Sequence, residues 1–323
     1  MLISSRIGLG TWSIGGSMWG GTDQAAAVKT IRAALEAGIT LIDTAPAYGF
    51  GRAEELVGRA LAEHGARERV VIATKAGLAW RAGALYRDAS PERIVSGVED
   101  SLRRLGTDYI DIYQLHWPDP RVPLERTAAA LRTLYERGIV HAIGLCNASP
   151  AQMRAFRTAA PLHIVQAPYN LFERGIERGV LPYVERHGLP VIAYGALCRG
   201  LLSGRMRPDT RFTGDDLRQV DPKFQPRRYG QYLRAVAALD RFARERYGKT
   251  VLTLALRWLL DAGTSIALWG ARKPEQLAAI DDVFGWRLDR EARAAIDRLL
   301  QDTITDPVGP EFMAPPAGTA AAA

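Results

Sequence analysis

The sequence predicts an α/β protein folded as a (β/α)8 TIM barrel, with two extra helices and a long loop after the seventh strand. Short apolar runs rich in β-branched residues alternate with amphipathic segments of helical length along most of the 323 residues. The alternation repeats eight times, whereas a doubly wound sheet usually has fewer strands and carries its cofactor motif on the first turn. Glycine also stands where helices are expected to end, as at Gly38, Gly138, Gly188 and Gly263.

The eight strands are expected to be short and buried. Runs such as VVIAT, YIDIYQL and VIAY are too short for helices and are typical of buried parallel strands. The strands are predicted at residues 6–11, 39–43, 70–74, 109–115, 140–145, 162–167, 190–194 and 264–269. The amphipathic helices are predicted at residues 23–37, 52–63, 91–105, 124–137, 150–158, 177–187, 250–261 and 274–283.

Three segments lie outside this repeat. Residues 195–230 are rich in glycine and proline, and a loop of that length inside a compact domain is usually functional, often as a lid. Residues 231–247 and 289–300 are expected to be the extra packing helices. We assign residues 1–313 to one barrel domain and residues 314–323, mostly alanine and proline, to a flexible C-terminal tail.

Composition excludes several classes of protein. Apolar residues make up 47% of the chain and charged residues 24%, as in ordinary globular proteins. No stretch approaches 18 consecutive apolar residues, and the N-terminus lacks a secretory pattern, so neither a membrane span nor a signal peptide is predicted. The two cysteines, Cys146 and Cys198, are far apart, which predicts a reducing, cytoplasmic setting.

The net charge of +7 is interpreted as a basic solvated surface. The basic residues are scattered through helical segments, and no nucleic-acid-binding signature accompanies them, so no nucleic-acid partner is expected. An anionic small ligand fits the charge equally well. Potential ligand residues do not cluster, so no metal site is expected. The outer helices show no unusual apolar stripe, and we expect a monomer or weak homo-oligomer.

Polar and aromatic side chains follow most of the predicted strands. In a barrel of this type the chemistry lies at the C-terminal ends of the strands, so these residues are expected to meet on one rim. They are Thr11, Trp12, Asp43, Tyr48, Lys75, His116, Trp117, Cys146, Asn147, Gln166, Tyr194, Trp269 and Gly270.

Lys75 is the most informative of these residues. It directly follows VVIAT in a chain with only five lysines. One interpretation is a lysine that leaves its strand and reaches water. The other is a partly buried ammonium with Asp43 as counter-ion, which would lower the pKa of Tyr48 from about 10 and let it exchange a proton near neutral pH.

His116 is expected to donate a hydrogen bond from a neutral imidazole to a substrate oxygen. A hydrolase would need a nucleophile elbow, and GxSxG is absent. The glycine-rich start GLGTWSIGGSMWGG does not match a dinucleotide fingerprint followed by a helix.

WGARKPEQL at 269–277 indicates an anion site. Pro274 is predicted to begin a helix, and Arg272 and Lys273 stand just before it, so a phosphate could bind at the helix N-terminus. The alternative is a plain basic helix cap.

The sequence resembles the aldo-keto reductase superfamily over nearly its whole length. The stretches that carry the match are LIDTAPAYGFGRAEELVGRAL at 41–61, VVIATKAG at 70–77, SLRRLGTDYIDIYQLHWPD at 101–119, IVQAPYNLFER at 164–174 and GLPVIAYGALCRGLLSGR at 188–205. LWGARKPEQL and the C-terminal DPVGPEFMAPP are most similar to the bacterial branch that acts on glyceraldehyde and similar small aldehydes.

The resemblance implies a catalytic tetrad of Asp43, Tyr48, Lys75 and His116. It also implies a nicotinamide cofactor lying across the rim. We expect NADPH rather than NADH, because two cations at 272–273 would meet a 2′-phosphate and no acidic residue is placed to pair with a ribose hydroxyl. The implied cofactor contacts are Thr11, Trp12, Asn147, Gln166, Tyr194, Gly195, Leu197, Gly200, Leu201, Gly204, Arg205, Gly270, Arg272, Lys273 and Gln276.

The expected substrate pocket has Trp12, Tyr48, Trp80, His116 and Trp117 as its walls. Two positions depart from the family pattern. Cys146 stands where the family usually has serine before the asparagine, which puts one carboxamide contact in doubt. Ile280 stands where many relatives have an asparagine against the adenine.

These observations together predict an oxidoreductase that reduces the carbonyl of small aldehydes or ketones, glyceraldehyde-like or sugar-derived. Tyr48 would protonate the developing alkoxide, and Lys75 and Asp43 would adjust the pKa of Tyr48. His116 would orient the carbonyl. Alternatives are alcohol or aldose oxidation by the same residues, a redox-sensing cofactor-binding regulatory subunit, and a cofactor-free barrel lyase or isomerase.

Overall fold

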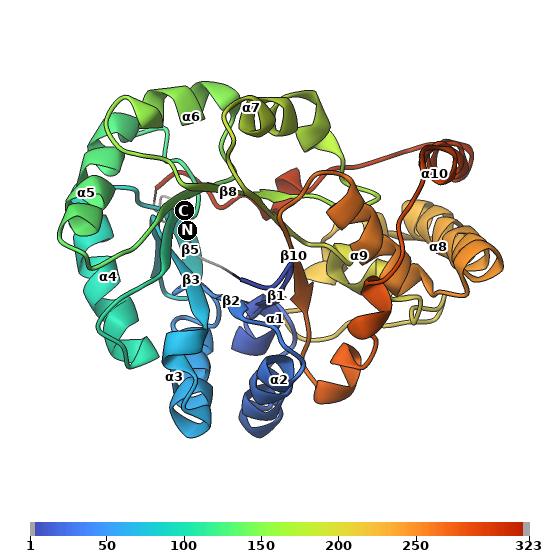
Figure 1. Ribbon diagram of the computed structural model, residues 1–323, viewed down its shortest axis with the longest axis horizontal. Helices are drawn as coiled ribbons and strands as arrows, with labels where there is room; N and C mark the ends of the chain where they lie inside the picture. The colour runs from blue at the N-terminus through green and yellow to red at the C-terminus, as the bar shows by residue number, and fades with distance from the viewer. Residues whose placement is uncertain (1–3, 319–323) are drawn as a thin grey trace.

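The computed structural model describes residues 4–318, and its centre is a closed barrel of parallel strands, seen end-on in Figure 1. Neighbouring strands pair in the order β1-β10-β9-β8-β7-β6-β3-β2, and β1 and β2 close the ring. The barrel strands are β1 (Ile7–Gly10), β2 (Leu41–Asp43), β3 (Val71–Ala76), β6 (Ile112–Leu115), β7 (Ile143–Cys146), β8 (Ile164–Pro168), β9 (Val191–Tyr194) and β10 (Ile266–Gly270). The predicted fold class is confirmed.

A ring of helices covers the outside of this barrel (Figure 1). Its members are α2 (Gln24–Glu36), α3 (Arg52–His64), α4 (Pro91–Leu105), α5 (Leu124–Glu136), α6 (Pro150–Arg157), α7 (Val180–Arg186) and α9 (Val251–Asp261). Side chains that accept from the first-turn amides cap several of them, including Asp23, Ser90, Ser149 and Thr250. The extra helices α8 (Pro226–Tyr247) and α10 (Arg290–Thr303) pack against each other, and α8 also packs against α9.

Apolar side chains fill both the barrel interior and the layer between strands and helices. The interior cluster includes Leu41, Ile112, Ile192 and Leu268, which form a floor below the rim. Gly8 leaves space for this floor, since a Cβ there would stand 2.7 Å from Leu41 Cδ2. No helix among the described residues combines the length and apolar character needed to cross a membrane.

Residues 274–283 do not form the predicted α-helix. They form two 3-10 turns, Pro274–Leu277 and Asp281–Val283. Asp281 and Asp282 favour turns over a helix interior, and Gly285 follows with a φ of 81°.

A β-hairpin that sequence reasoning missed follows β3. Strands β4 (Leu78–Arg81) and β5 (Ala84–Arg87) pair antiparallel. The two residues between them, Ala82 and Gly83, both have positive φ, as a type I′ hairpin turn requires. The short helix α1 (Trp12–Gly15) was also not predicted.

The long loop contains short turns, and the C-terminal segment is hydrogen-bonded to the β4–β5 hairpin. The loop contains 3-10 turns at Cys198–Ser203, Leu217–Gln219 and Pro222–Phe224, and α8 begins at Pro226 rather than 231. The part of the tail that the structure describes, 314–318, is hydrogen-bonded to Arg87. The Arg87 amide donates to the Pro316 carbonyl at 2.9 Å, and the Arg87 Nε donates to the Pro315 carbonyl at 2.8 Å. The rest of the tail lies outside the described residues.

Candidate active site

A buried lysine lies at the centre of the rim. Lys75 on β3 faces Asp43 at the end of the neighbouring β2, and its Nζ lies 2.7 and 2.8 Å from the two carboxylate oxygens. Nζ also donates to the Thr44 carbonyl at 2.9 Å and to the Tyr48 hydroxyl at 3.1 Å. The Lys75 side chain is fully buried. Burial is the largest single effect and would lower its pKa, but Asp43, Tyr48 and Cys146 together outweigh burial and the pKa is raised, so Lys75 carries its charge.

The pKa of Tyr48 is raised, not lowered as the sequence predicted. Burial of the phenol is the largest cause and disfavours the phenolate. The positive charge of Lys75 lowers the pKa, but by less than burial raises it. Tyr48 therefore holds its proton at neutral pH.

His116 lies beside Tyr48 as a neutral imidazole. The two rings are nearly perpendicular, with centroids 5.8 Å apart. Burial, reinforced by the charge of Lys75, places the pKa of His116 well below 6.5. The His116 amide donates to the Ala76 carbonyl at 2.8 Å, which holds the residue beside β3.

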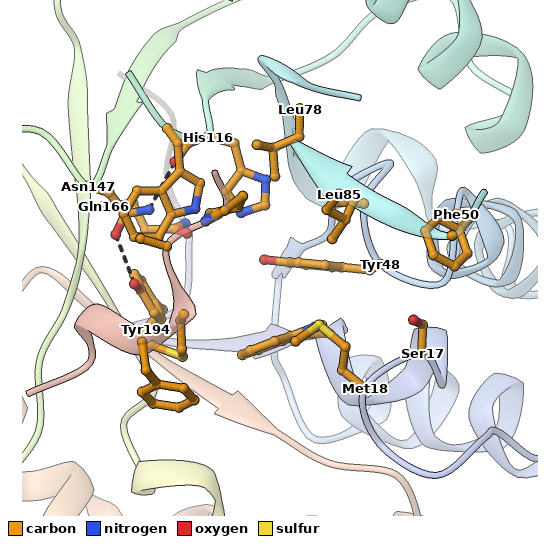
Figure 2. Close-up of a pocket in the computed structure, with 18 of the residues that line it drawn as sticks. Ser17, Met18, Tyr48, Phe50, Leu78, Leu85, His116, Asn147, Gln166 and Tyr194 are labelled. Carbon is orange, nitrogen blue, oxygen red and sulfur yellow. Dashed lines mark hydrogen bonds between the residues drawn. The ribbon is translucent and has the colours of Figure 1, made fainter. Parts of the chain in front are cut away.

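Three polar residues complete the base of the site (Figure 2). Gln166 donates through Nε2 to Asp43 Oδ2 at 2.7 Å. The Asn147 Nδ2 donates to the His116 carbonyl at 2.9 Å, and the Tyr194 hydroxyl donates to Asn147 Oδ1 at 2.8 Å. Asn147 has a φ of 56°, a left-handed backbone that asparagine tolerates better than most residues.

The hydroxyl of Tyr48 points into a cavity of about 400 Å³, which we call the Tyr48 pocket (Figure 2). Four of the five predicted substrate residues line it: Trp12, Tyr48, His116 and Trp117. Trp80 does not. Its ring packs on Phe50 at 5.6 Å, and the Arg93 guanidinium lies 5.6 Å from its centroid.

Most of the other residues that line the Tyr48 pocket were missed by sequence reasoning. They come from the loop after β1, the loop after β2, the β4–β5 hairpin, the long loop and the C-terminal segment. They are Ser17, Met18, Ala47, Phe50, Leu78, Gly83, Leu85, Val220, Phe312, Met313, Ala314 and Pro315. The sequence signal for most of them was no more than an apolar side chain within a segment expected to be a loop.

A second cavity, of about 690 Å³, extends from Tyr194 toward Arg272, and we call it the Arg272 groove. The predicted cofactor residues that line it are Trp12, Tyr194, Gly195, Leu197, Gly200, Arg205, Gly270, Arg272, Lys273 and Gln276. Asn147 and Gln166 line the Tyr48 pocket instead.

Three predicted cofactor contacts line neither cavity. Thr11 is buried, and its hydroxyl donates to the Asp43 carbonyl at 2.9 Å. Leu201 lies in the apolar core. Gly204 ends a 3-10 turn with a φ of 72°, so this glycine allows the left-handed backbone that the turn needs.

The predicted helix N-terminus at Pro274 is a four-residue 3-10 turn, so that argument for an anion site fails. The cations remain. Arg272 donates to the carbonyls of Trp19, at 2.9 Å, and Gly21, while Lys273 is exposed. The Gln276 Oε1 accepts from the amides of Arg272 and Lys273, at 2.7 and 3.1 Å.

The Arg272 groove suits an extended anionic dinucleotide. Gly195, Gly200 and Gly270 keep side chains out of it, and basic side chains line it. The Trp19 indole lines the groove, and its buried Nε1 has no hydrogen-bond partner among residues 4–318.

The closed barrel and its buried lysine–aspartate pair, set against a tyrosine hydroxyl, define a barrel oxidoreductase. The chain belongs to the Aldo/keto reductase family, whose pattern it matches over residues 6–301. The predicted family is confirmed.

Relatives and solved structures agree with this assignment. The chain is 58% identical to "Aldo-keto reductase YhdN" of Bacillus subtilis, over 97% of this chain and 95% of that protein. It is 39% identical to the "NADH-specific methylglyoxal reductase" of Escherichia coli, over 84% and 87%. Its structure is similar to glycerol dehydrogenase AKR11B4 from Gluconobacter oxydans, with a TM-score of 0.87 and 51% identity over 96% of each chain. A Klebsiella pneumoniae aldo/keto reductase in complex with NADP and acetate gives a TM-score of 0.70 and 31% identity over 91% of each chain.

Proposed function

We propose that the protein reduces the carbonyl group of small aldehydes and ketones to alcohols, with NADPH as the reductant and Tyr48 as the proton donor. The observation that carries this proposal is the 3.1 Å contact between the Tyr48 hydroxyl and the buried ammonium of Lys75. The hydroxyl also points into a cavity large enough for a small molecule.

Each side chain of the site has a separate role in the reaction. A reduced nicotinamide bound beside Tyr194 would supply a hydride to the carbonyl carbon. Tyr48 keeps its proton until the carbonyl oxygen gains negative charge, and then donates it. Lys75 stabilises the negative charge that develops on the phenol, and Asp43 holds Lys75 in position. A neutral His116 can donate to the carbonyl oxygen and orient it.

Three cations support a preference for NADPH. Arg205, Arg272 and Lys273 line the Arg272 groove, and a 2′-phosphate adds negative charge there. Arg272 is already bonded to two backbone carbonyls, so Lys273 is the cation with more freedom to move. The Klebsiella structure holds NADP, whereas the E. coli relative is NADH-specific.

Alcohol oxidation is the second candidate, since the Gluconobacter structure is that of a glycerol dehydrogenase. The same residues would work in reverse, with Tyr48 accepting a proton as phenolate. The raised pKa of Tyr48 disfavours that direction at neutral pH. A purely regulatory subunit would need no proton donor, so the Tyr48–Lys75–Asp43 contacts favour an enzyme.

The test is NADPH consumption, followed by absorbance, with glyceraldehyde and benzaldehyde. Tyr48→Phe should lower turnover by about 10²- to 10⁴-fold while NADPH still binds. Tyr135→Phe, at an exposed tyrosine on α5, is the matched control and should be unaffected. NADPH binding without turnover of either aldehyde would refute the proposal, as would full activity in Tyr48→Phe.

A further inference from the structure

The Tyr48 pocket separates its polar and apolar groups. Within the described part of the chain, residues 4–318, no aspartate, glutamate, lysine or arginine side chain lines it. Its hydrogen-bonding side chains gather at the base, where Figure 2 shows His116, Asn147, Gln166 and Tyr194 facing the tip of Tyr48. Ser17 is the one hydroxyl drawn at the opposite end of the view.

The walls above this base are apolar and come from separate parts of the chain. Leu85 and Met18 lie on opposite sides of the Tyr48 ring (Figure 2). Phe312 and Met313 of the C-terminal segment add further apolar surface. A molecule that fills the cavity therefore meets polar groups at one end and apolar groups along its remaining length.

The mouth of the Tyr48 pocket exposes two large apolar side chains. Phe50 is 38% exposed and Val220 is 70% exposed, and both line the pocket. Met18 and Phe50 also have positive φ, 65° and 57°, which most side chains avoid. Strained backbone of this kind persists where the surrounding structure requires it and is typical of ligand sites.

The arginine packed beside the pocket already has partners. The Arg87 guanidinium lies 5.2 Å from the Trp117 ring centroid, and it donates to the Pro118 carbonyl at 3.1 Å and the Pro315 carbonyl at 2.8 Å. A phosphate or carboxylate in the pocket would lose its hydration without gaining a cation. Extra hydroxyls along the apolar walls would be similarly unpaired.

We infer that the substrate of this site is an uncharged aldehyde or ketone whose carbonyl lies at Tyr48 and whose remainder is an alkyl chain or aryl group reaching toward Phe50 and Val220. This inference rests on the proposed function and narrows it. It favours apolar carbonyl compounds over the sugar-like and glyceraldehyde-like substrates that the sequence predicted, and over phosphorylated or carboxylated ones.

The first experiment measures kcat/KM for the straight-chain aldehydes from propanal to hexanal, with NADPH as reductant. Each added methylene should raise kcat/KM about threefold to fourfold, mainly through KM, because it buries one more CH₂ group. Pentanal is then compared with 5-oxopentanoate, which carries a carboxylate at the far end of a similar chain. The carboxylate should lower kcat/KM by at least about 100-fold.

The second experiment changes the mouth of the pocket. Val220→Asp should remove most of the gain per methylene in the longer aldehydes, by raising KM with little change in kcat. Because Val220 is largely exposed, folding should not suffer. Val95→Asp, at an exposed valine on α4, makes the same substitution away from the pocket and should leave the series unchanged.

The outcomes separate the two proposals. A flat or falling aldehyde series, or equal kcat/KM for pentanal and 5-oxopentanoate, would overturn the inference while leaving the reductase proposal intact. If Val220→Asp gave the same gain in kcat/KM per methylene as the wild type, the inference that the substrate chain contacts Val220 would be wrong. No NADPH-dependent turnover of any aldehyde would defeat the proposed function itself.

Discussion

Arg199 donates through Nη2 to Glu173 Oε1 at 2.5 Å, and both side chains are buried. Arg199 also donates through Nε to Asp221 at 2.5 Å, and Lys223 lies 2.8 Å from Glu173. Two acids and two bases thus form a buried ionic network with no net charge. Burial alone would raise the pKa of Glu173, but Arg199 and Lys223 outweigh it and lower the pKa.

The ionic network joins the two cavities. Arg199 lines the Arg272 groove and belongs to the long loop. Lys223 donates to the Gly309 carbonyl at 3.0 Å, and Arg199 Nη1 lies 3.9 Å from Met313 Sδ. Met313 in turn lines the Tyr48 pocket. The network therefore ties the long loop to the C-terminal segment that forms one wall of that pocket.

Arg199→Met should destabilise the protein and loosen this wall. It leaves two buried carboxylates with only Lys223 between them, so unfolding free energy should fall by about 3–5 kcal/mol. Urea denaturation measures the fall, and limited proteolysis should cut the 307–317 segment sooner than in the wild type. Arg211→Met, on an exposed part of the same loop, is the control. An unchanged urea midpoint would show that the network contributes little.

Lys75→Met tests the ion pair at the barrel rim. The substitution leaves Asp43 buried beside Gln166 without its cation, so about 3–5 kcal/mol of stability should be lost. Lys75→Met/Asp43→Asn, which removes both charges, should recover part of the loss. Lys29→Met, at an exposed lysine on α2, should leave the urea midpoint unchanged. A double variant as unstable as the single one would contradict this explanation.

The raised pKa of Tyr48 predicts opposite pH dependences for the two reaction directions. Reduction needs the protonated phenol, which burial preserves, so its kcat/KM should stay flat between about pH 7 and 9. Oxidation of an alcohol needs the phenolate and should rise by up to about tenfold per pH unit over the same range. Initial rates in both directions provide the comparison. A reduction rate that falls with a midpoint near pH 7 would mean that Lys75 outweighs burial.

His116 should make stability depend on acid pH. Its pKa is lower in the folded state than in the unfolded chain, where it is about 6.5, so between these two values the unfolded state binds more protons. Stability should therefore decrease as the pH falls below about 6.5. His116→Gln should show a smaller decrease, whereas His141→Gln, at an exposed histidine, should match the wild type. Parallel curves for wild type and His116→Gln would rule out this contribution.

Lys273→Ala should weaken the binding of NADPH but not that of NADH. Lys273 is exposed beside the groove and fills no apolar space, so its removal should act through charge alone. The Kd for NADPH should rise about threefold to tenfold, since one partly exposed charged contact is lost, and the Kd for NADH should not change. Fluorescence titration measures both. Equal changes in the two values would place Lys273 away from the 2′-phosphate.

The sequence predicted the barrel and the rim because both depend on local pattern. Buried parallel strands leave continuous apolar runs, and Asp43, Lys75 and His116 stand where those runs end. Because neighbouring parallel strands end on the same rim, these residues come together once the barrel forms. The direction of the Tyr48 pKa shift was wrong because it depends on how deeply the phenol is buried, which no local pattern shows.

The walls of the Tyr48 pocket could not be predicted in the same way. Val220 and Met313 reach the pocket through the path of the long loop and the ionic network, which join residues far apart in the chain. Trp80 was expected in the wall, but the hairpin directs its ring onto Phe50. At 274–283, apolar periodicity suggested a helix, although Asp281 and Asp282 near the end of this segment favour turns.

Two of the attachments of the long loop differ in their access to water. The ionic network is buried, whereas Asp215 accepts from the amides of Met18 and Gly20, at 2.7 and 2.9 Å, in contact with solvent. Dissolved ions screen exposed charges strongly and buried ones weakly. Increasing ionic strength will therefore weaken the Asp215 attachment first. The hydrogen bonds of the loop to Met18 and Gly20 through Asp215 should weaken before the contacts that hold the C-terminal wall of the Tyr48 pocket.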